Sequence, residues 1–283
     1  MKILVPVDFS PDSLKALQYA ITLAKLMEDR SGKGQSHPEL LIYHAFHMPI
    51  GGDATFFINS AMLDKVEKHE QNKLRQLVAT MPEIHSISHR IVTKMTLPGE
   101  GILQIIDKES IDLVVMGIRG ANESVNWLGS APFHIMKHVS CPVLAVPRST
   151  DTFHPRQVAF ATDLEAIEDI SDSLSFLRKL LQLWQANVHI IHVHPKPARI
   201  GIAKAEEALH LDQILQDIPH TYDFPEEKNA TQGISYYLQN HTVDLLVMVP
   251  RYHFALENVF HKSVTRYLTT HTSIPLLTLH EKL

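Results

Sequence analysis

Short runs of apolar, often β-branched residues recur along the chain, and polar or glycine-containing loops separate them. The first run spans Ile3 to Val7, and later ones include residues 113–116 and 143–146. Their length and their lack of polar alternation predict strands that are buried on both faces, as in a parallel sheet. Between them lie longer segments, such as residues 14–24, in which apolar positions recur at helical spacing. The pattern therefore predicts an α/β fold.

The same pattern predicts the elements in order. In the first half we expect strands at residues 3–7, 40–45, 90–93, 113–116 and 143–146, and helices from residue 11 and at 60–80, 102–109 and 131–139. In the second half we expect strands within residues 157–163 and at 187–193, 220–223, 244–248 and 276–279, and helices at 167–184, 204–216 and 231–240.

The second half of the chain repeats the first. Residues 157–163 match the first strand and its end, with Asp163 in the place of Asp8. Residues 244–248 repeat 112–116 almost residue for residue, and 273–279 repeat 140–146 in the same way. The polar residues around 149–155 form a joint. We therefore predict two tandem α/β domains, residues 1–149 and 155–283.

A glycine-containing loop follows the strand at residues 113–116. Gly117 and Gly120 permit positive φ and close backbone approach, and Gly129 and Ser130 precede the helix predicted at 131–139. Ser130 stands where an N-cap belongs, and the free N–H groups of a helix start attract phosphate. A glycine-rich turn before an ordinary capped helix is the alternative, because short motifs often match by chance.

The second half does not repeat this loop. Val249 replaces Gly117, no glycine follows near Tyr252, and Lys262-Ser263 replaces Gly129-Ser130. The helix cap is kept and the glycines are lost, so we expect a ligand in the first half and a scaffold in the second. An alternative is that basic residues of the second half replace the glycines: Arg251, Lys262 and Arg266.

Composition narrows the class of protein. The net charge is −5, from 26 basic and 31 acidic residues without a basic block, so we expect no nucleic-acid partner. No apolar run is long enough to span a membrane, and the chain starts with a strand rather than a signal-peptide pattern. The one cysteine, Cys141, suits a reducing compartment and precedes a strand, so we expect a buried structural thiol in a cytoplasmic protein.

Nineteen histidines raise the question of a metal site. His192 and His194 alternate on one face of a predicted strand, and His189 points to the other. Neither a cysteine partner nor a pair of histidines at zinc-binding spacing on a helix accompanies them. We therefore expect no metal ligands among the protein's residues.

Three motifs together resemble the universal stress protein family, over both halves of the chain. They are Val5-Pro6-Val7-Asp8-Phe9-Ser10, then Gly117-Ile-Arg-Gly120 followed by Gly129-Ser130, and then Cys141-Pro142-Val143-Leu144-Ala145-Val146-Pro147. The resemblance implies a flavodoxin-like or Rossmann-like sheet of five parallel strands in each half. One branch of the family binds ATP through the pattern G-x2-G-x9-G-[S/T], and another lacks the pattern and binds no nucleotide.

The resemblance also implies a set of nucleotide-binding residues. Asp8 would contact the ribose or the adenine, which Pro6, Val7 and Ala45 would line, with Met116 beneath the base. Phosphates would lie on the loop and on the start of the following helix: Gly117, Arg119, Gly120, Gly129, Ser130 and Ala131. A divalent ion, Mg or Mn, is expected with the ATP. Between Gly120 and Gly129 there are eight residues rather than nine, a deletion of a kind that loops usually tolerate.

Three hypotheses follow for function. The first is a stress-response regulatory protein that binds ATP in its N-terminal domain, with slow hydrolysis at most, because neither a placed general base nor an arginine finger is visible. The second is an interaction or scaffold module with a vestigial pocket and no nucleotide. The third is a carrier of another small ligand in the second domain.

The last strand of each half should be a sheet edge that needs a partner. Family members dimerise by pairing these edges, so strands 143–146 and 276–279 are expected to pair within the chain as an internal pseudo-dimer. A further homodimer of two chains and unidentified protein partners remain open.

Overall fold

The computed structural model describes residues 1–30, 37–46, 60–118, 135–136, 139–151, 153–194, 201–249 and 273–280. Its strands are β1 (Lys2–Pro6), β2 (Glu39–Phe46), β3 (Ser88–Met95), β4 (Leu113–Ile118), β5 (Val143–Pro147), β6 (Gln157–Ala161), β7 (Asn187–Ile191), β8 (His220–Asp223), β9 (Leu245–Met248) and β10 (Leu276–Thr278). Its helices are α1 (Pro11–Arg30), α2 (Ser60–Ala79), α3 (Pro98–Glu109), α5 (Ser171–Trp184), α6 (Ile202–Ile214) and α7 (Ala230–Asn240), with short 3-10 helices η1 (Pro82–Ser86) and η3 (Ile167–Ile170).

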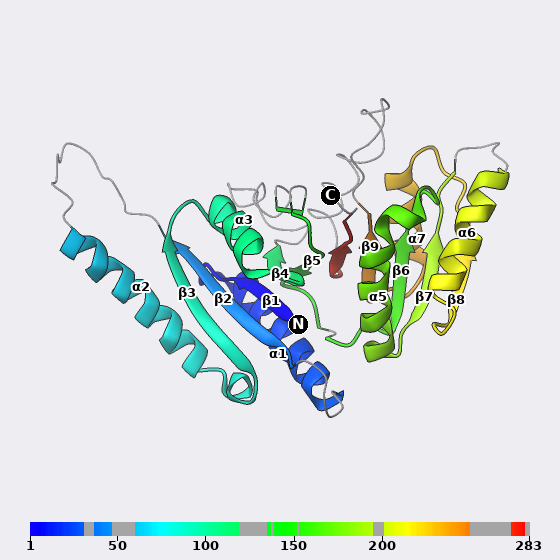
Figure 1. Ribbon diagram of the computed structural model, residues 1–283. Coiled ribbons are helices and arrows are strands. Elements are labelled where there is room, and N and C mark those ends of the chain that lie inside the picture. The colour runs from blue at the N-terminus through cyan, green and yellow to red at the C-terminus, as the bar shows by residue number, and fades with distance from the viewer. Residues whose placement is uncertain are drawn as a thin grey trace.

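All these strands belong to one sheet, in the order β3-β2-β1-β4-β5-β10-β9-β6-β7-β8 (Figure 1). Pairing is parallel from β3 to β5 and from β10 to β8. At the centre, β5 and β10 pair antiparallel, with Leu277 opposite Leu144. The predicted α/β fold class is confirmed, and the last strands of the two halves pair as expected. The domain boundaries at residues 149 and 155 stay a prediction.

Helices cover both faces of this sheet (Figure 1). Successive strand residues, such as Ile3 and Leu4, belong to different buried clusters. One cluster includes residues of α1, α2, α5 and α6, and the other includes residues of α3 and α7. Burial on both faces explains why the strands read as continuous apolar runs.

Most predicted elements are found within a few residues, and one helix differs in kind. The helix predicted at 167–184 is divided into η3 and α5: after Ala166, whose φ is 41°, the chain makes a tight 3-10 turn before α5 begins at Ser171. Of the helix predicted at 131–139, residues 135, 136 and 139 are described, and the Val139 N–H donates to the Ile135 carbonyl at 3.1 Å.

An aspartate at the amino end of the sheet is used in the same way in each half. The Lys2 N–H donates to Asp112 at 2.7 Å. The Arg156 and Gln157 N–H groups donate to Asp244 at 2.8 and 2.9 Å. Each carboxylate therefore joins the start of the first strand of its half to the start of the fourth.

Cys141 is buried, as expected. Burial, with a smaller contribution from the nearby Asp112 carboxylate, raises the pKa of its thiol to about 12. A thiol with such a pKa is a poor nucleophile at neutral pH.

Candidate functional site

The carboxyl ends of β1, β2 and β4 meet at one edge of the first half. Pro6 ends β1 and pairs with Tyr43 of β2, two residues before Ala45. On the other side, Leu4 pairs with Val114, so Met116 and Gly117 lie near the end of the neighbouring strand, at the same edge. The fold thus brings the described members of the predicted site to adjacent positions. In open parallel sheets, this edge is where ligands bind.

Asp8 lies in a tight turn directly after β1. Ser10 donates to its Oδ1 twice, from the backbone N–H at 3.0 Å and from the hydroxyl at 2.5 Å. Desolvation raises the pKa of Asp8, but hydrogen bonds with Ser10 and Ser13 outweigh it and lower that pKa below the ordinary value. Asp8 is exposed and ionised at neutral pH, so it can accept hydrogen bonds from a ligand hydroxyl or amine.

The turn is strained and capped. Phe9 has a φ of 63°, which is unusual for a bulky residue. Ser10 then accepts the Ser13 N–H on its hydroxyl at 3.2 Å, which is the N-cap bond predicted for α1. The strain and the cap together hold Asp8 in one place.

Two of the predicted adenine-lining residues are buried. Val7 is 3% exposed, and both of its backbone groups are occupied: its N–H donates to the Tyr43 carbonyl at 2.7 Å, and its carbonyl bonds with His44 Nδ1 at 2.6 Å. Met116 belongs to the cluster that packs against α3. Pro6 and Ala45 are partly exposed. A ligand at this edge would therefore reach side chains of Val7 and Met116 only after local movement.

Gly117 has a packing role that the sequence did not reveal. A Cβ at this position would overlap the backbone carbonyl of Asp12 and lie 2.8 Å from the Ser13 nitrogen. The first turn of α1 thus approaches the end of β4 so closely that only glycine fits. This close approach explains the residue without a ligand, so its role in phosphate binding stays a prediction.

A group on α2 that sequence reasoning missed lies beside the same turn. His44 Nε2 is 3.5 Å from Glu70, and the His44 ring meets the Phe9 ring edge-on at 4.7 Å. The Lys73 ammonium lies over the Phe9 ring, 4.9 Å from its centroid, and pairs with the Glu70 carboxylate at 2.8 Å. No sequence signal links these residues, because they lie on different elements. They tie α2 to the loop that carries Asp8.

The equivalent edge of the second half has the same backbone features as the first. His192 Nδ1 bonds with the Thr162 carbonyl at 3.1 Å, as His44 does with Val7. Leu164, at the position of Phe9, also has a positive φ, 52°. Here α6 holds the loop after β6, because Lys204 donates to the Asp163 carbonyl at 2.6 Å and Glu207 accepts the Ile167 N–H at 2.9 Å.

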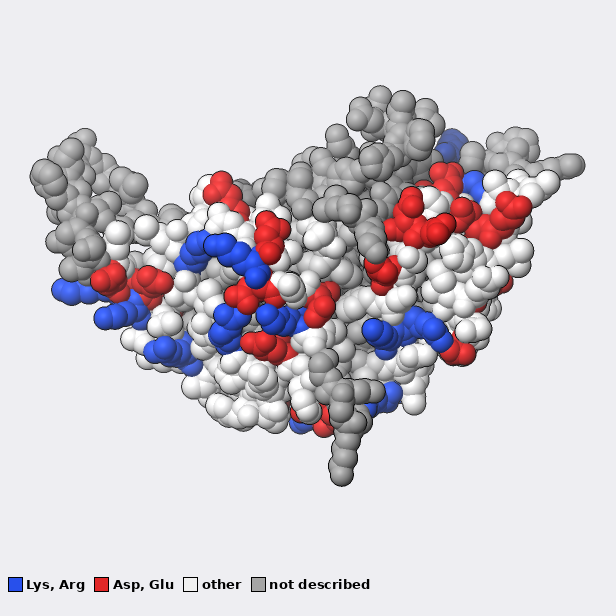
Figure 2. Space-filling model, in the orientation of Figure 1, with Lys and Arg blue, Asp and Glu red and all other residues white. Residues whose placement is uncertain are grey.

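The charge at the two edges differs. Residues 8–17 contain two acids and one lysine, a net charge of −1, whereas residues 163–172 contain five acids and no base, a net charge of −5. Figure 2 shows acidic side chains gathered over the start of α5 and over α6. The five acids are Asp163, Glu165, Glu168, Asp169 and Asp172. Lys204 pairs with Glu165 at 3.3 Å and offsets one of these charges, and the remaining excess of acids disfavours a phosphate anion.

Several predicted residues lie outside the part of the chain that the structure describes. In the first half these are Arg119, Gly120, Gly129, Ser130 and Ala131. The basic residues suggested as replacements in the second half, Arg251, Lys262 and Arg266, lie outside it as well.

Within the described ranges, His, Cys, Asp and Glu side chains form no group of three that could hold a metal ion. No described helix combines the length and the apolar character needed to cross a bilayer.

Comparison with known proteins shows which family this chain belongs to. The sequence profile of the universal stress protein family matches residues 1–147, more than half of the chain. The chain belongs to the universal stress protein family. A curated relative, universal stress protein MJ0531 of Methanocaldococcus jannaschii, is 27% identical over 151 residues, which cover 52% of this chain and 82% of that protein.

A second curated relative of this universal stress protein is universal stress protein A homolog 1 of Coxiella burnetii, 26% identical over 51% of this chain and 94% of that protein. A solved universal stress protein from Archaeoglobus fulgidus aligns over 99% of this chain and 98% of its own, with a TM-score of 0.71 and 17% identity. At that identity the match shows a shared fold over both halves.

A family protein from Arabidopsis thaliana, solved with AMP bound, aligns over 52% of this chain and 92% of its own, with 18% identity and a TM-score of 0.33. At that score the match carries no argument about the geometry of this chain.

Proposed function

We propose that this universal stress protein binds an adenine nucleotide, ATP, in its N-terminal half, hydrolyses it slowly or not at all, and acts in the stress response through a change of conformation or partner. The observation that supports the proposal is the placement of Asp8. Its ionised carboxylate is exposed and held by Ser10 where β1, β2 and β4 end.

The charge contrast favours the first half over the second. A triphosphate brings several negative charges, so it is repelled less by the edge at residues 8–17 than by the five acids at 163–172. Mg or Mn would accompany ATP through its phosphates, since the described residues provide no cluster of metal ligands.

Titration of the full chain with ATP tests the proposal, with matched variants in the two halves. Asp8→Ala should weaken ATP binding about tenfold, because a hydrogen bond to a charged group is lost. Asp163→Ala, at the equivalent position, should leave the affinity unchanged. An ATP affinity that follows Asp163 rather than Asp8, or no binding at millimolar ATP, would refute the proposal. Phosphate release with Mg or Mn present should stay near the buffer rate.

The packing role of Gly117 favours a second candidate, an interaction module with a vestigial pocket. Under that alternative the glycine persists because α1 needs it, and no nucleotide is bound. The same titration decides between the two candidates. Gly117→Val is unsuitable for this purpose, because it would disturb α1 whether or not ATP binds.

A further inference from the structure

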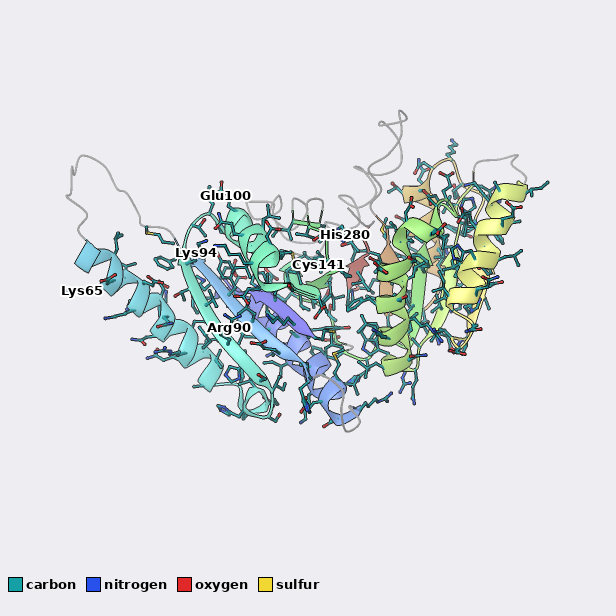
Figure 3. All side chains as sticks on the ribbon, viewed as in Figure 1. Lys65, Arg90, Lys94, Glu100, Cys141 and His280 are labelled. Atoms are coloured by element: carbon teal, nitrogen blue, oxygen red, sulfur yellow. The ribbon has the colours of Figure 1, made fainter. Side chains whose placement is uncertain are left out.

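A charged residue stands on the inner face of α2. This helix packs on β3 and β2, and its exposed Lys65 lies on the side away from these strands (Figure 3). Leu74 and Val78 belong to the same buried cluster as Val7. Glu70 precedes Leu74 by one helical turn, so it lies on the same face of α2. The Glu70 side chain is 16% exposed, and a carboxylate shielded from water to this extent needs partners.

The first partner of Glu70 holds the residue before Asp8. The Glu70 carboxylate lies 3.5 Å from His44 Nε2. On the other side of the ring, His44 Nδ1 bonds with the Val7 carbonyl at 2.6 Å. A carbonyl only accepts hydrogen bonds, so Nδ1 carries a proton and donates. A ring with a partner at each nitrogen is restrained from turning, so Glu70 helps to keep His44 on the Val7 carbonyl.

The second partner of Glu70 contacts the residue after Asp8. The Lys73 ammonium donates to the Glu70 carboxylate at 2.8 Å and lies 4.9 Å from the centroid of the Phe9 ring. The edge of the His44 ring meets the same Phe9 ring, with 4.7 Å between the centroids. Phe9 has a φ of 63°, a strained conformation that persists only where the surroundings fix it. Asp8 therefore lies between two residues whose places depend on partners of Glu70.

The second half holds its aspartate in another way. His192 bonds with the Thr162 carbonyl, but among the residues that the structure describes no ion pair joins His192 to a carboxylate. Instead, Lys204 of α6 donates directly to the carbonyl of Asp163. A carboxylate that pairs with the histidine is thus found in the half to which the proposed function assigns the nucleotide.

We infer that Glu70 is a positioning residue for Asp8 in the nucleotide site of the first half, and that it acts through His44 and Lys73. The inference rests on the proposed function, with Asp8 on the nucleoside part of the ligand. Without Glu70, the chain on both sides of Asp8 is held less firmly. ATP and adenosine share the nucleoside, so the affinities for both should fall by the same factor.

The test titrates ATP and adenosine separately into the full chain at pH 7.5. Glu70→Ala should weaken the binding of both about fivefold, because a charged contact that holds the loop is lost. Glu70→Gln, whose amide can still bond with His44 Nε2, should keep both affinities within about twofold. The deciding variant combines Glu70→Ala with Asp8→Ala. Its affinities should equal those of Asp8→Ala alone, because Glu70 acts only through that carboxylate.

Two variants serve as matched controls. Glu67→Ala makes the same change at an exposed position about one turn earlier on α2, and should change neither affinity. Glu207→Ala removes the acceptor of the Ile167 N–H in the second half, and should change neither affinity as well. If Glu70→Ala does not fold, as judged by circular dichroism, Lys73→Met decides in its place. It should weaken the binding of both ligands, and its effect should likewise vanish when Asp8 is replaced by alanine.

Three results would overturn this inference while the proposed function stands. They are no loss with Glu70→Ala, a loss for ATP without one for adenosine, and a loss that persists in full in the Asp8→Ala background. If the unsubstituted chain binds neither ATP nor adenosine, the proposed function fails and this inference fails with it.

Discussion

The two halves differ most where β4 and β9 end. In the first half, Gly117 lets the first turn of α1 touch the strand backbone. In the second half, Val249 stands at this position and joins a buried cluster with Leu164, Ile167 and Ile170, and α5 starts only after the turn of η3. The start of the helix after the first strand of each half, α1 or α5, thus decides which residue fits at the end of β4 or after β9. The glycine and the valine are each explained by packing within their own half.

Features that recur in both halves belong to the fold rather than to a ligand. A histidine bonds with the carbonyl of the residue after the first strand (His44, His192), and a positive φ follows the aspartate of that loop (Phe9, Leu164). An aspartate accepts backbone N–H groups at the amino end of the sheet (Asp112, Asp244), and a helix glycine packs closely on a residue in or just after the second strand (Gly101 on Tyr43, Gly233 on Val193). The remaining differences, in charge and in the loop after the fourth strand, are the ones that can carry function.

The largest effect is expected at Gly117. Gly117→Val should lower the free energy of unfolding by about 3 kcal/mol, because the new side chain overlaps backbone that cannot easily move. Urea unfolding of the full chain measures the loss. Val249→Ala is the control from the second half and should cost about 2 kcal/mol by ordinary loss of burial. A urea midpoint for Gly117→Val that equals the unsubstituted one would show that α1 can shift, and the proposed contrast would be wrong.

A smaller effect separates the two aspartates at the amino end of the sheet. Asp244→Ala removes the acceptor of two backbone N–H groups and should cost about 2 kcal/mol, whereas Asp112→Ala removes the acceptor of one and should cost about 1 kcal/mol. Urea unfolding again provides the measurement. Equal losses, or a larger loss at Asp112, would mean that these bonds do not set the difference.

The smallest effect concerns pH. Burial lowers the pKa of His192 and of His280, although backbone carbonyls oppose it. Both histidines are neutral in the folded and the unfolded chain above about pH 7.5. As the pH falls through about 6.5, the unfolded chain binds protons first, so stability falls. Thermal unfolding between pH 8 and pH 5.5 should show this fall, and the variant with both His192→Gln and His280→Gln should reduce it.

Two carboxylates at the candidate site of the first half have lowered pKa values, so their contribution to stability changes at a lower pH. Desolvation raises the pKa of Glu70, but Lys73 and His44 outweigh it, and the pKa of Glu70 falls below its ordinary value, as does that of Asp8. Their contribution is present above about pH 4.5 and is lost as the pH falls through the lowered values. Thermal unfolding of the full chain between pH 6 and pH 3 should show this loss, and Glu70→Gln should reduce it. A loss that is already complete near pH 6, or that Glu70→Gln leaves unchanged, would contradict this order.

Much of the fold could be predicted because local pattern and topology agree. Continuous apolar runs such as 113–116 imply strands buried on both faces. The repeat of 140–146 in 273–279 indicated the duplication, and the resemblance to a family that pairs its last strands implied the central pairing of β5 with β10. The N-cap at Ser10 was predicted because it depends on neighbours three residues apart. By contrast, the 3-10 turn of η3, which follows Ala166 and precedes α5, leaves no periodicity signal, so the start of the α-helix was predicted four residues early.

By itself, the sequence determined the fold class, the duplication and the edge of the sheet where a site is expected, because these follow from periodicity and repeated motifs. Only the tertiary structure decided that Gly117 serves the approach of α1, that Glu70 reaches His44, and that His280 bonds with the Met136 carbonyl of the other half. Such contacts join residues that are from 26 to 144 positions apart along the chain. They depend on how helices sit on the sheet, and a pattern read along one strand or helix contains no information about that placement.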